Sequence, residues 1–276
     1  IPDEYAAYCG YYILSGGRLA SVNLDRTAGR FRVSSVVGGV EVPALCLYYS
    51  KGAFYRDDSG GMQLYFTMVD GEQYAVEPFV GFDMAFMRRL PAIEVPFSME
   101  MDMNGKRWLR RNVKPFEGAF LIDSHLVQSC TIEALPGYVD FCGIKKIESP
   151  TYAGMPAGAT RDLGDLTLMH NDGETWAQVL DMLYSPADST ATLSIGANVV
   201  TIGDSGYSEW LRAAHDSVLT FQIPAGGRTF VFATDGSPKY DSSVDEGDVF
   251  VNEGDFVEIC GAPTDQFTIE CEAAYR

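Results

Sequence analysis

The sequence predicts an all-β protein with minor helix, in which an antiparallel meander closes into a barrel and a second β barrel or sandwich follows. Three observations predict this fold class. Short runs of alternating apolar and polar residues recur along the chain, Gly- and Asp-rich turns separate them, and no run carries a catalytic or cofactor signature. Alternation with a period of two places one face of each strand on a core and the other in water.

The first 79 residues contain six runs of strand length. The residues between the runs accept a positive φ or hydrogen-bond to their own backbone, and no crossover helix is expected between them. A meander of this length must protect its edge strands, and closing into a barrel is the usual way to do so. The expected strands lie at 18–24, 30–33, 44–49, 53–56, 62–68 and 73–76.

The segment 80–117 has a different pattern. Asp83 is placed to cap a short helix that runs to Leu90 and stops at Pro91. The turn-forming pair that begins at Asn104 predicts a hairpin. The basic residues that follow, interpreted as a solvated arm of this hairpin, are Lys106, Arg107, Arg110 and Arg111.

A domain boundary is expected near Pro115, so that residues 1–115 form the barrel and residues 116–276 a second β domain. In that domain the apolar residues between Trp176 and Tyr184 fall at helical spacing and predict one short helix packed against a sheet. The expected strands of the second domain lie at 129–135, 138–146, 163–169, 218–223, 228–232, 249–251, 256–259 and 267–269.

Charge and composition exclude several classes of function. The chain carries 20 Lys and Arg against 38 Asp and Glu, a formal net charge of −18, which would repel a nucleic acid backbone. No run approaches the roughly twenty apolar residues of a membrane span, and no N-terminal stretch has the pattern of a signal peptide. Because the chain starts at Ile1, it is expected to be a processed product or an excised piece.

The six cysteines and three histidines follow no metal-binding pattern. There is no Cys-x-x-Cys pair and no short His spacing, so neither a metal nor a cofactor is expected. Cys260 and Cys271 could bridge neighbouring strands in an exported protein, but buried free thiols are the preferred interpretation. Two acidic turns, 245–248 and 252–255, could gather calcium and are otherwise solvated loops.

One tetrapeptide matches a catalytic motif. Residues 203–206 have the sequence that surrounds the nucleophile of chymotrypsin-like proteases, with Ser205 in the nucleophile position. That fold needs its histidine far upstream, whereas His215 lies downstream, and a turn is due after Ile202. The tetrapeptide is therefore interpreted as a turn.

Aromatic residues suggest a binding function. Tyr occurs 15 times, and several copies fall in the meander, where a barrel mouth could stack on a sugar or an apolar ligand. Packing in the core is the preferred interpretation, because β-sheets are rich in aromatic residues without any ligand. The candidate ligand-binding residues are Tyr11, Tyr12, Tyr49, Tyr65 and Trp210.

Two stretches resemble a known family. Residues 8–12, with the sequence Tyr-Cys-Gly-Tyr-Tyr, and the Gly-Arg-Leu at 17–19 are similar to the opening of the lipocalin-like barrels that follow the catalytic domain in β-lactamase-related, penicillin-binding-protein-like serine hydrolases. Residues 206–211 and the strand at 217–224 resemble the C-terminal part of large bacterial members of that group. Each match covers about a quarter of the chain.

The resemblance implies an accessory role. Members of the family use a Ser-x-x-Lys motif, a Tyr-x-Asn element and a Lys-Thr-Gly strand, none of which occurs here, so no catalytic residue is carried over. The chain is then expected to be a non-catalytic region that packs on an N-terminal serine hydrolase domain, limits substrate access and acts at the cell envelope or outside the cell. The alternative is a module that binds a carbohydrate or a small apolar ligand.

Overall fold

The structure is a computed structural model that describes residues 1–14, 16–56, 63–94, 98–156, 164–171, 173–204 and 207–274. It confirms the all-β class, since three short 3-10 helices accompany 26 strands in these residues. The chain divides into two compact units. One combines Ile1–Asn104 with Ser129–Leu166, and the other combines Gly105–Gln128 with Thr167–Arg276. The expected division near Pro115 stays a prediction.

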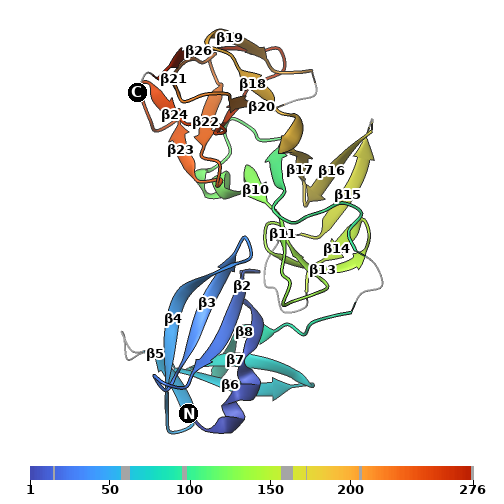
Figure 1. The fold of residues 1–276 in the computed structure, drawn as a ribbon, viewed down its shortest axis with the longest axis vertical. Helices are drawn as coiled ribbons and strands as arrows, with labels where there is room; N and C mark the ends of the chain where they lie inside the picture. The colour runs from blue at the N-terminus through green and yellow to red at the C-terminus, as the bar shows by residue number, and fades with distance from the viewer. Residues whose placement is uncertain are drawn as a thin grey trace. The chain divides into compact units, whose positions relative to one another are not determined.

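The first unit is built on an eight-stranded antiparallel barrel, coloured blue to cyan in Figure 1. Each strand pairs with the next along the chain, and β1 pairs with β8 through Tyr12 and Arg89, which closes the barrel. The 3-10 helix η1 (Asp3–Tyr8) precedes it. The strands are β1 (Gly10–Leu14), β2 (Leu19–Asp25), β3 (Arg30–Val37), β4 (Val40–Ser50), β5 (Ala53–Arg56), β6 (Gln63–Val69), β7 (Glu72–Phe79) and β8 (Phe82–Arg89).

Aromatic and aliphatic side chains fill the inside of the barrel. Phe31 and Phe54 are fully buried, and their ring centroids lie 4.9 Å apart. Two tyrosines of η1 join the same cluster, with the ring of Tyr8 stacked on Phe66 at 4.5 Å and that of Tyr5 edge-on to Phe54 at 5.2 Å. The barrel interior is therefore a packed core.

The helix expected after Asp83 is wrong, because these residues form strand β8. Gly81, at a φ of +87°, makes the turn from β7. A helix cap contributes only about 1 kcal/mol, whereas β8 pairs along both edges, with β7 and with β1. The expected hairpin at Asn104 is also wrong. A turn occurs there, but the following strand β9 (Arg107–Arg110) pairs with β10 (Leu126–Gln128) and β17 (Met182–Pro186).

Four short strands of the first unit pack on the outside of the barrel. Ile13, Leu19 and Val36 of the barrel are at most 5% exposed, because they share an apolar cluster with residues such as Leu135 and Ile144. Both faces of β1 and β2 are thus buried. The covering strands are β11 (Cys130–Thr131), β12 (Tyr138–Asp140), β13 (Ile144–Ser149) and β14 (Tyr152–Gly154).

The second unit begins with five strands in the order β10-β9-β17-β16-β15, which include β15 (Leu166–Asn171) and β16 (Glu174–Val179). The helix expected between Trp176 and Tyr184 is wrong, because this segment is the β16–β17 hairpin. Leu180, at a φ of +56°, makes its turn. Apolar residues on both faces of two short strands produced a spacing that resembles a helix.

A β sandwich completes the second unit, in the orange and red part of Figure 1. Its two sheets enclose one apolar core. All pairings are antiparallel except β18 with β20. One sheet has the order β18 (Ala191–Leu193), β20 (Ser208–Ala213), β25 (Phe256–Cys260), β22 (Arg228–Phe232), β23 (Pro238–Asp241), and the other β19 (Gly196–Thr201), β26 (Gln266–Ala273), β21 (Ser217–Gln222), β24 (Val249–Val251).

The five-stranded sheet is also covered on its outer face. Trp210, Phe230 and Phe256 of this face are at most 3% exposed and share a cluster with Leu109 of β9 and Leu126 of β10. The 3-10 helix η2 (Ala119–Ser124) leads into β10, and η3 (Ala187–Ser189) follows β17. Among the described residues, the structure has no helix whose length and hydropathy would let it cross a membrane.

Gly137 is a position where the fold requires glycine, and its replacement is the first prediction. Its φ is +86°, and a Cβ there would lie 2.8 Å from the carbonyl oxygen of Ile93. We expect Gly137→Ala to lower the free energy of unfolding by about 2 kcal/mol or more, since an L-residue in this region already costs about 1–2 kcal/mol. Urea denaturation measures the loss.

The matched control is Gly52→Ala. Gly52 has a φ of +87° with open space around its Cα, so the control carries the backbone cost without the steric one. Equal losses for the two variants would contradict the proposed close packing at Ile93.

Candidate functional site

The first unit has an open cleft of about 580 Å³, a volume in the range of small-molecule sites. Tyr11 of β1 lies in its wall, together with residues at the β6–β7 turn, at the end of β8 and in the covering segment. Two adjacent arginines, Arg88 and Arg89, and one carboxylate, Glu72, supply its charged groups. Met68 and Pro91 supply exposed apolar surface, with the buried Leu90 and Leu135 behind them. The cleft therefore combines charge with an apolar wall.

Arg89 holds η1 on the end of the barrel. Its guanidinium donates hydrogen bonds to the carbonyl oxygens of Ala7 at 2.8 Å and Cys9 at 3.0 Å, and to Oε1 of Gln73 at 2.8 Å. Tyr12 adds a hydrogen bond from its hydroxyl to the carbonyl oxygen of Tyr8 at 2.7 Å. These acceptors are neutral, and within the described ranges Arg89 has no carboxylate partner.

Arg88 forms an ion pair with Glu72. Its Nε donates to Oε2 of Glu72 at 2.7 Å and its Nη2 to Oε1, while the hydroxyl of Tyr74 donates to Oε2 at 3.0 Å. The Arg88 side chain is 12% exposed, whereas that of Glu72 is 44% exposed. The hydrogen bonds from Arg88 and Tyr74 lower the pKa of Glu72, so this carboxylate is charged at neutral pH.

The five aromatic residues predicted to bind a ligand lie in different places. Tyr11 lines the cleft, while Tyr12 is fully buried in the barrel and Tyr49 packs against Phe54 with a centroid distance of 5.4 Å. Tyr65, half-buried on β6, donates a hydrogen bond to Asp83. Trp210 is 3% exposed in the second unit. The structure therefore does not gather these five residues into one aromatic surface.

The charged residues of the cleft were missed from the sequence. Arg88 and Arg89 are two consecutive basic residues in a strongly acidic chain, and this was a usable signal. Their position at the end of an expected helix concealed this signal, because a basic residue is ordinary there. Glu72 is 16 residues from Arg88, and only the β7–β8 pairing brings the two together.

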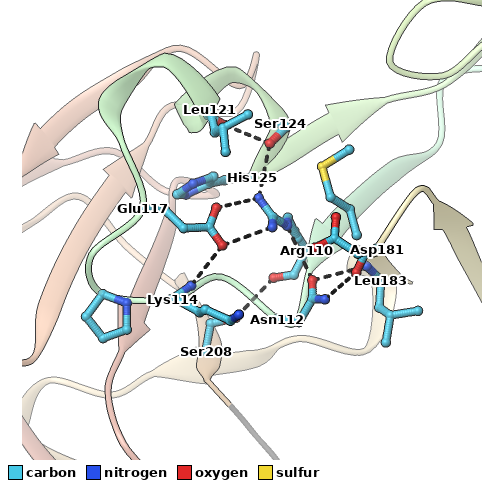
Figure 2. A network of polar contacts seen from close by, with 12 residues as sticks. Arg110, Asn112, Lys114, Glu117, Leu121, Ser124, His125, Asp181, Leu183 and Ser208 are labelled. Carbon is cyan, nitrogen blue, oxygen red and sulfur yellow. Dashed lines mark hydrogen bonds and ion pairs between the residues drawn. The ribbon is translucent and has the colours of Figure 1, made fainter. Parts of the chain in front are cut away.

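A buried polar network is the second candidate, and Figure 2 shows it in the second unit. Arg110, whose side chain is 4% exposed, donates from both Nη atoms to the carboxylate of Glu117, at 2.8 and 3.0 Å. Its Nε donates to Oδ1 of Asn112 at 3.3 Å, and Asn112 in turn donates to the carbonyl oxygen of Asp181 at 2.6 Å. The indole of Trp210 donates to the Arg110 carbonyl oxygen at 2.7 Å.

These contacts correct the interpretation of the basic arm. Arg110 is a buried hub that joins β9 to the segments around it, and Lys106 pairs with Asp188 at 3.3 Å. Arg107 lies over the ring of Phe256, 6.0 Å from its centroid. The basic residues are therefore used inside the second unit, which explains why a hydrophilic run follows the turn at Asn104.

A histidine and a glutamate pair at the centre of the covered sheet face. Nδ1 of His125 lies 2.7 Å from Oε2 of Glu258, and the two side chains are 2% and 0% exposed. The ring of His125 is edge-on to Phe230, with centroids 4.9 Å apart. Burial raises the pKa of Glu258, although His125 and Arg110 oppose this shift. Burial and the neighbouring Glu258 also raise the pKa of the Cys260 thiol.

Two further buried cations are paired inside their units. Arg228, 9% exposed, donates from Nε to Oδ1 of Asp241 at 2.8 Å. Burial would raise the pKa of Asp241, but hydrogen bonds from Arg228 and Ser243 outweigh it and lower the pKa. In the first unit burial lowers the pKa of Lys145, which is 0% exposed and donates to the carbonyl oxygen of Cys142 at 3.5 Å.

The remaining sequence candidates do not form a site in the described residues. Ser205 and Gly206 of the protease-like tetrapeptide lie outside those residues. In the acidic turns, Asp255 pairs with Lys239 at 2.7 Å and Asp245 accepts a backbone hydrogen bond from Asp241. Across the described ranges, no three His, Cys, Asp or Glu side chains are arranged to hold a metal. Cys260 and Cys271 are buried thiols without a disulfide, as preferred from the sequence.

Comparison with known proteins identifies no relative of this chain. No family model, no curated protein and no solved structure matches this chain. The geometry of its own side chains therefore carries the functional argument.

Replacing Arg89 should release η1 from the barrel. In Arg89→Lys a single amine cannot reach the three acceptors that the guanidinium holds, and hydrogen bonds to charged groups contribute roughly 1.5–3 kcal/mol each. We expect the amide of Cys9, which donates to the Ala6 carbonyl oxygen, to exchange at least about tenfold faster. NMR hydrogen exchange measures this.

The control is Arg26→Lys, which changes the other arginine that contacts η1. Arg26 pairs with Asp3, but the two side chains are 59% and 89% exposed, so the change should leave exchange at Cys9 as it is. A similar acceleration in both variants, or in neither, would refute the role given to Arg89.

Glu258 should make stability depend on pH. The pKa of Glu258 is raised in the folded protein above its ordinary value of 4.5. As pH rises above 4.5, the unfolded chain loses this proton before the folded protein does, which favours unfolding. The stability of the wild type relative to Glu258→Gln should therefore be greatest below pH 4.5 and fall as the pH rises through the folded-state pKa.

Urea denaturation across this pH range tests the sign. Glu246→Gln, at an exposed position of the same unit, provides the control and should show no such trend. A difference between wild type and Glu258→Gln that is flat, or that grows with pH, would contradict the assignment.

Proposed function

We propose that this chain is a non-catalytic β region of a bacterial serine hydrolase related to β-lactamases, which acts at the cell envelope or outside the cell. In this proposal it packs on the catalytic domain and limits which substrates reach the active site. One observation carries it: the described pair of a histidine and a carboxylate is enclosed by packed side chains, as are one thiol and one amine. His125, Glu258, Cys260 and Lys145 are, as whole residues, at most 1% exposed and sit in packed cores.

Apolar side chains on a hairpin tip support the packing role. At the β7–β8 turn Phe79, Val80 and Phe82 are 47%, 101% and 62% exposed, and the two phenylalanine rings stack with centroids 5.5 Å apart. Exposed apolar patches on soluble proteins commonly mark interaction surfaces. We assign the catalytic domain of the same polypeptide as the surface that covers this tip.

The test has two arms. Residues 1–276 alone should show no turnover of ester, β-lactam or D-amino-peptide substrates, and a Ser-x-x-Lys domain should be encoded in frame upstream of Ile1.

In that full polypeptide, Phe79→Ser with Phe82→Ser should change kcat/KM for bulky substrates severalfold more than for a small ester. Phe116→Ser, at an 82% exposed position of the second unit, is the control.

Two outcomes would refute the proposal. Turnover by residues 1–276 alone would contradict the non-catalytic role, and an upstream frame without such a domain would contradict the accessory role.

A second candidate function is the binding of a small ligand, without catalysis. The cleft beside Tyr11 favours it, because it is open and lined by both polar and apolar groups. Ligand binding inside the barrel is not favoured, since Phe31, Phe54 and Phe66 fill the interior.

A further inference from the structure

The cleft of the first unit has more positive charge than its own carboxylate balances. Arg88 and Arg89 both line it, while Glu72 is the acidic residue in its wall. The acceptors of Arg89 are two backbone carbonyls and an amide, which satisfy its N–H groups without neutralising its charge. A local positive site in a chain with a net charge of −18 favours an anionic group.

Glu72 occupies the position that a ligand carboxylate would take. It accepts two parallel hydrogen bonds from Arg88, the geometry in which guanidinium groups recognise carboxylates. Glu72 follows Asp70 and Gly71, which form a tight turn with φ values of +50° and +82°, and its side chain is 44% exposed. The pair is open to water on the side of Glu72, so this carboxylate can turn into water and leave Arg88 to another acid.

The apolar wall beside the arginines indicates that the rest of the ligand is apolar. Leu90 and Leu135 are at most 3% exposed and belong to the apolar cluster under the cleft, while Met68 on its rim is 59% exposed. Because the cleft has one unbalanced positive charge within an acidic chain, it suits a ligand with one negative charge better than a polyanion.

We propose that this cleft binds small molecules that carry one carboxylate and an apolar body. The carboxylate replaces Glu72 on Arg88, next to the fixed charge of Arg89, and the apolar body lies against Met68 and Pro91, with the buried Leu90 and Leu135 behind them. Glu72 is then an internal competitor that sets the affinity. The inference rests on the second candidate function, ligand binding, and names the ligand class of that site.

The test uses the whole chain and 4-phenylbutyrate, with its neutral amide 4-phenylbutyramide and acetate as comparison probes. NMR titration should give the order phenylbutyrate, then acetate and the amide, with at least about a tenfold difference in Kd between the first and the others. Glu72→Gln should tighten phenylbutyrate binding severalfold, because it removes the competitor's charge. Arg88→Met should weaken it at least about tenfold, and a thermal melt checks that each variant is folded.

A matched control separates the specific effect from the loss of one charge. Glu148, also ion-paired at the surface of the first unit and 48% exposed, lies outside the cleft, so Glu148→Gln should leave the Kd unchanged. Equal tightening by both glutamine variants would overturn the competitor role. Binding that does not respond to Arg88→Met, or no binding of phenylbutyrate, would overturn the carboxylate site.

The failures of the two proposals are distinguishable. If neutral sugars bind and Tyr11→Ala abolishes that binding while phenylbutyrate does not bind, the chain is a binding module and the carboxylate class is wrong. If no probe shifts any resonance of the cleft, the ligand-binding function itself is refuted. Neither result depends on whether the chain has hydrolytic turnover.

Discussion

Strands β22 and β25 bury every residue on both faces, so a polar side chain that they carry can find a partner only inside the protein. Among the described residues, Oγ1 of Thr229 and Oε1 of Glu258 are buried without a hydrogen-bond partner. An unpaired buried charge is strongly destabilising. Glu258 stands at the middle of β25 between Trp210 and Phe230 on the neighbouring strands, and His125 is the group that meets it. The segment around η2 is therefore held on the sheet by this pair as well as by apolar contacts, and Arg110 fixes the other side of the same segment.

In the first unit, part of the barrel is likewise covered on both faces, and the cleft lies at the edge of the segment that covers it. Residues such as Leu135 cover the outer face of the barrel over Ile13 and Leu19. Next to Leu90 and Leu135 the cleft opens, and Arg88 and Glu72 form their ion pair in its wall. The cleft is thus bounded by the covering segment on one side and by the β6–β7 turn on the other.

Local pattern predicted most of the strands and failed where pairing partners decide the structure. The alternation in the meander and the regular runs after Ser217 became strands β2–β7, β21, β22 and β24–β26 at nearly the expected positions, while β23 was not predicted. Asp83 and the run from Trp176 predicted helices because a capping residue and apolar spacing are properties of the local sequence. Strands β8, β16 and β17 are stabilised instead by pairing within sheets that include strands distant in sequence. The His125–Glu258 pair is separated by 133 residues, and no sequence spacing could indicate it. Tyr11 was identified as a site residue from composition, but the arginines beside it were not.

Because packed side chains fill the cores, a function of this protein must use its surface. Strand β8 carries two unusual parts of that surface, an exposed apolar tip and a charged cleft. Phe82, on the apolar tip, begins the strand, and Arg88 and Arg89 of the cleft end it. At roughly 3.4 Å per residue, the six residue-to-residue steps from Phe82 to Arg88 span about 20 Å. A protein domain that covers the tip therefore need not close the cleft, and a ligand in the cleft need not touch the tip. The same strand would nevertheless carry both a partner on the tip and an acid on Arg88. Its Arg88 end is paired with both β7 and β1, and its Phe82 end is paired with β7.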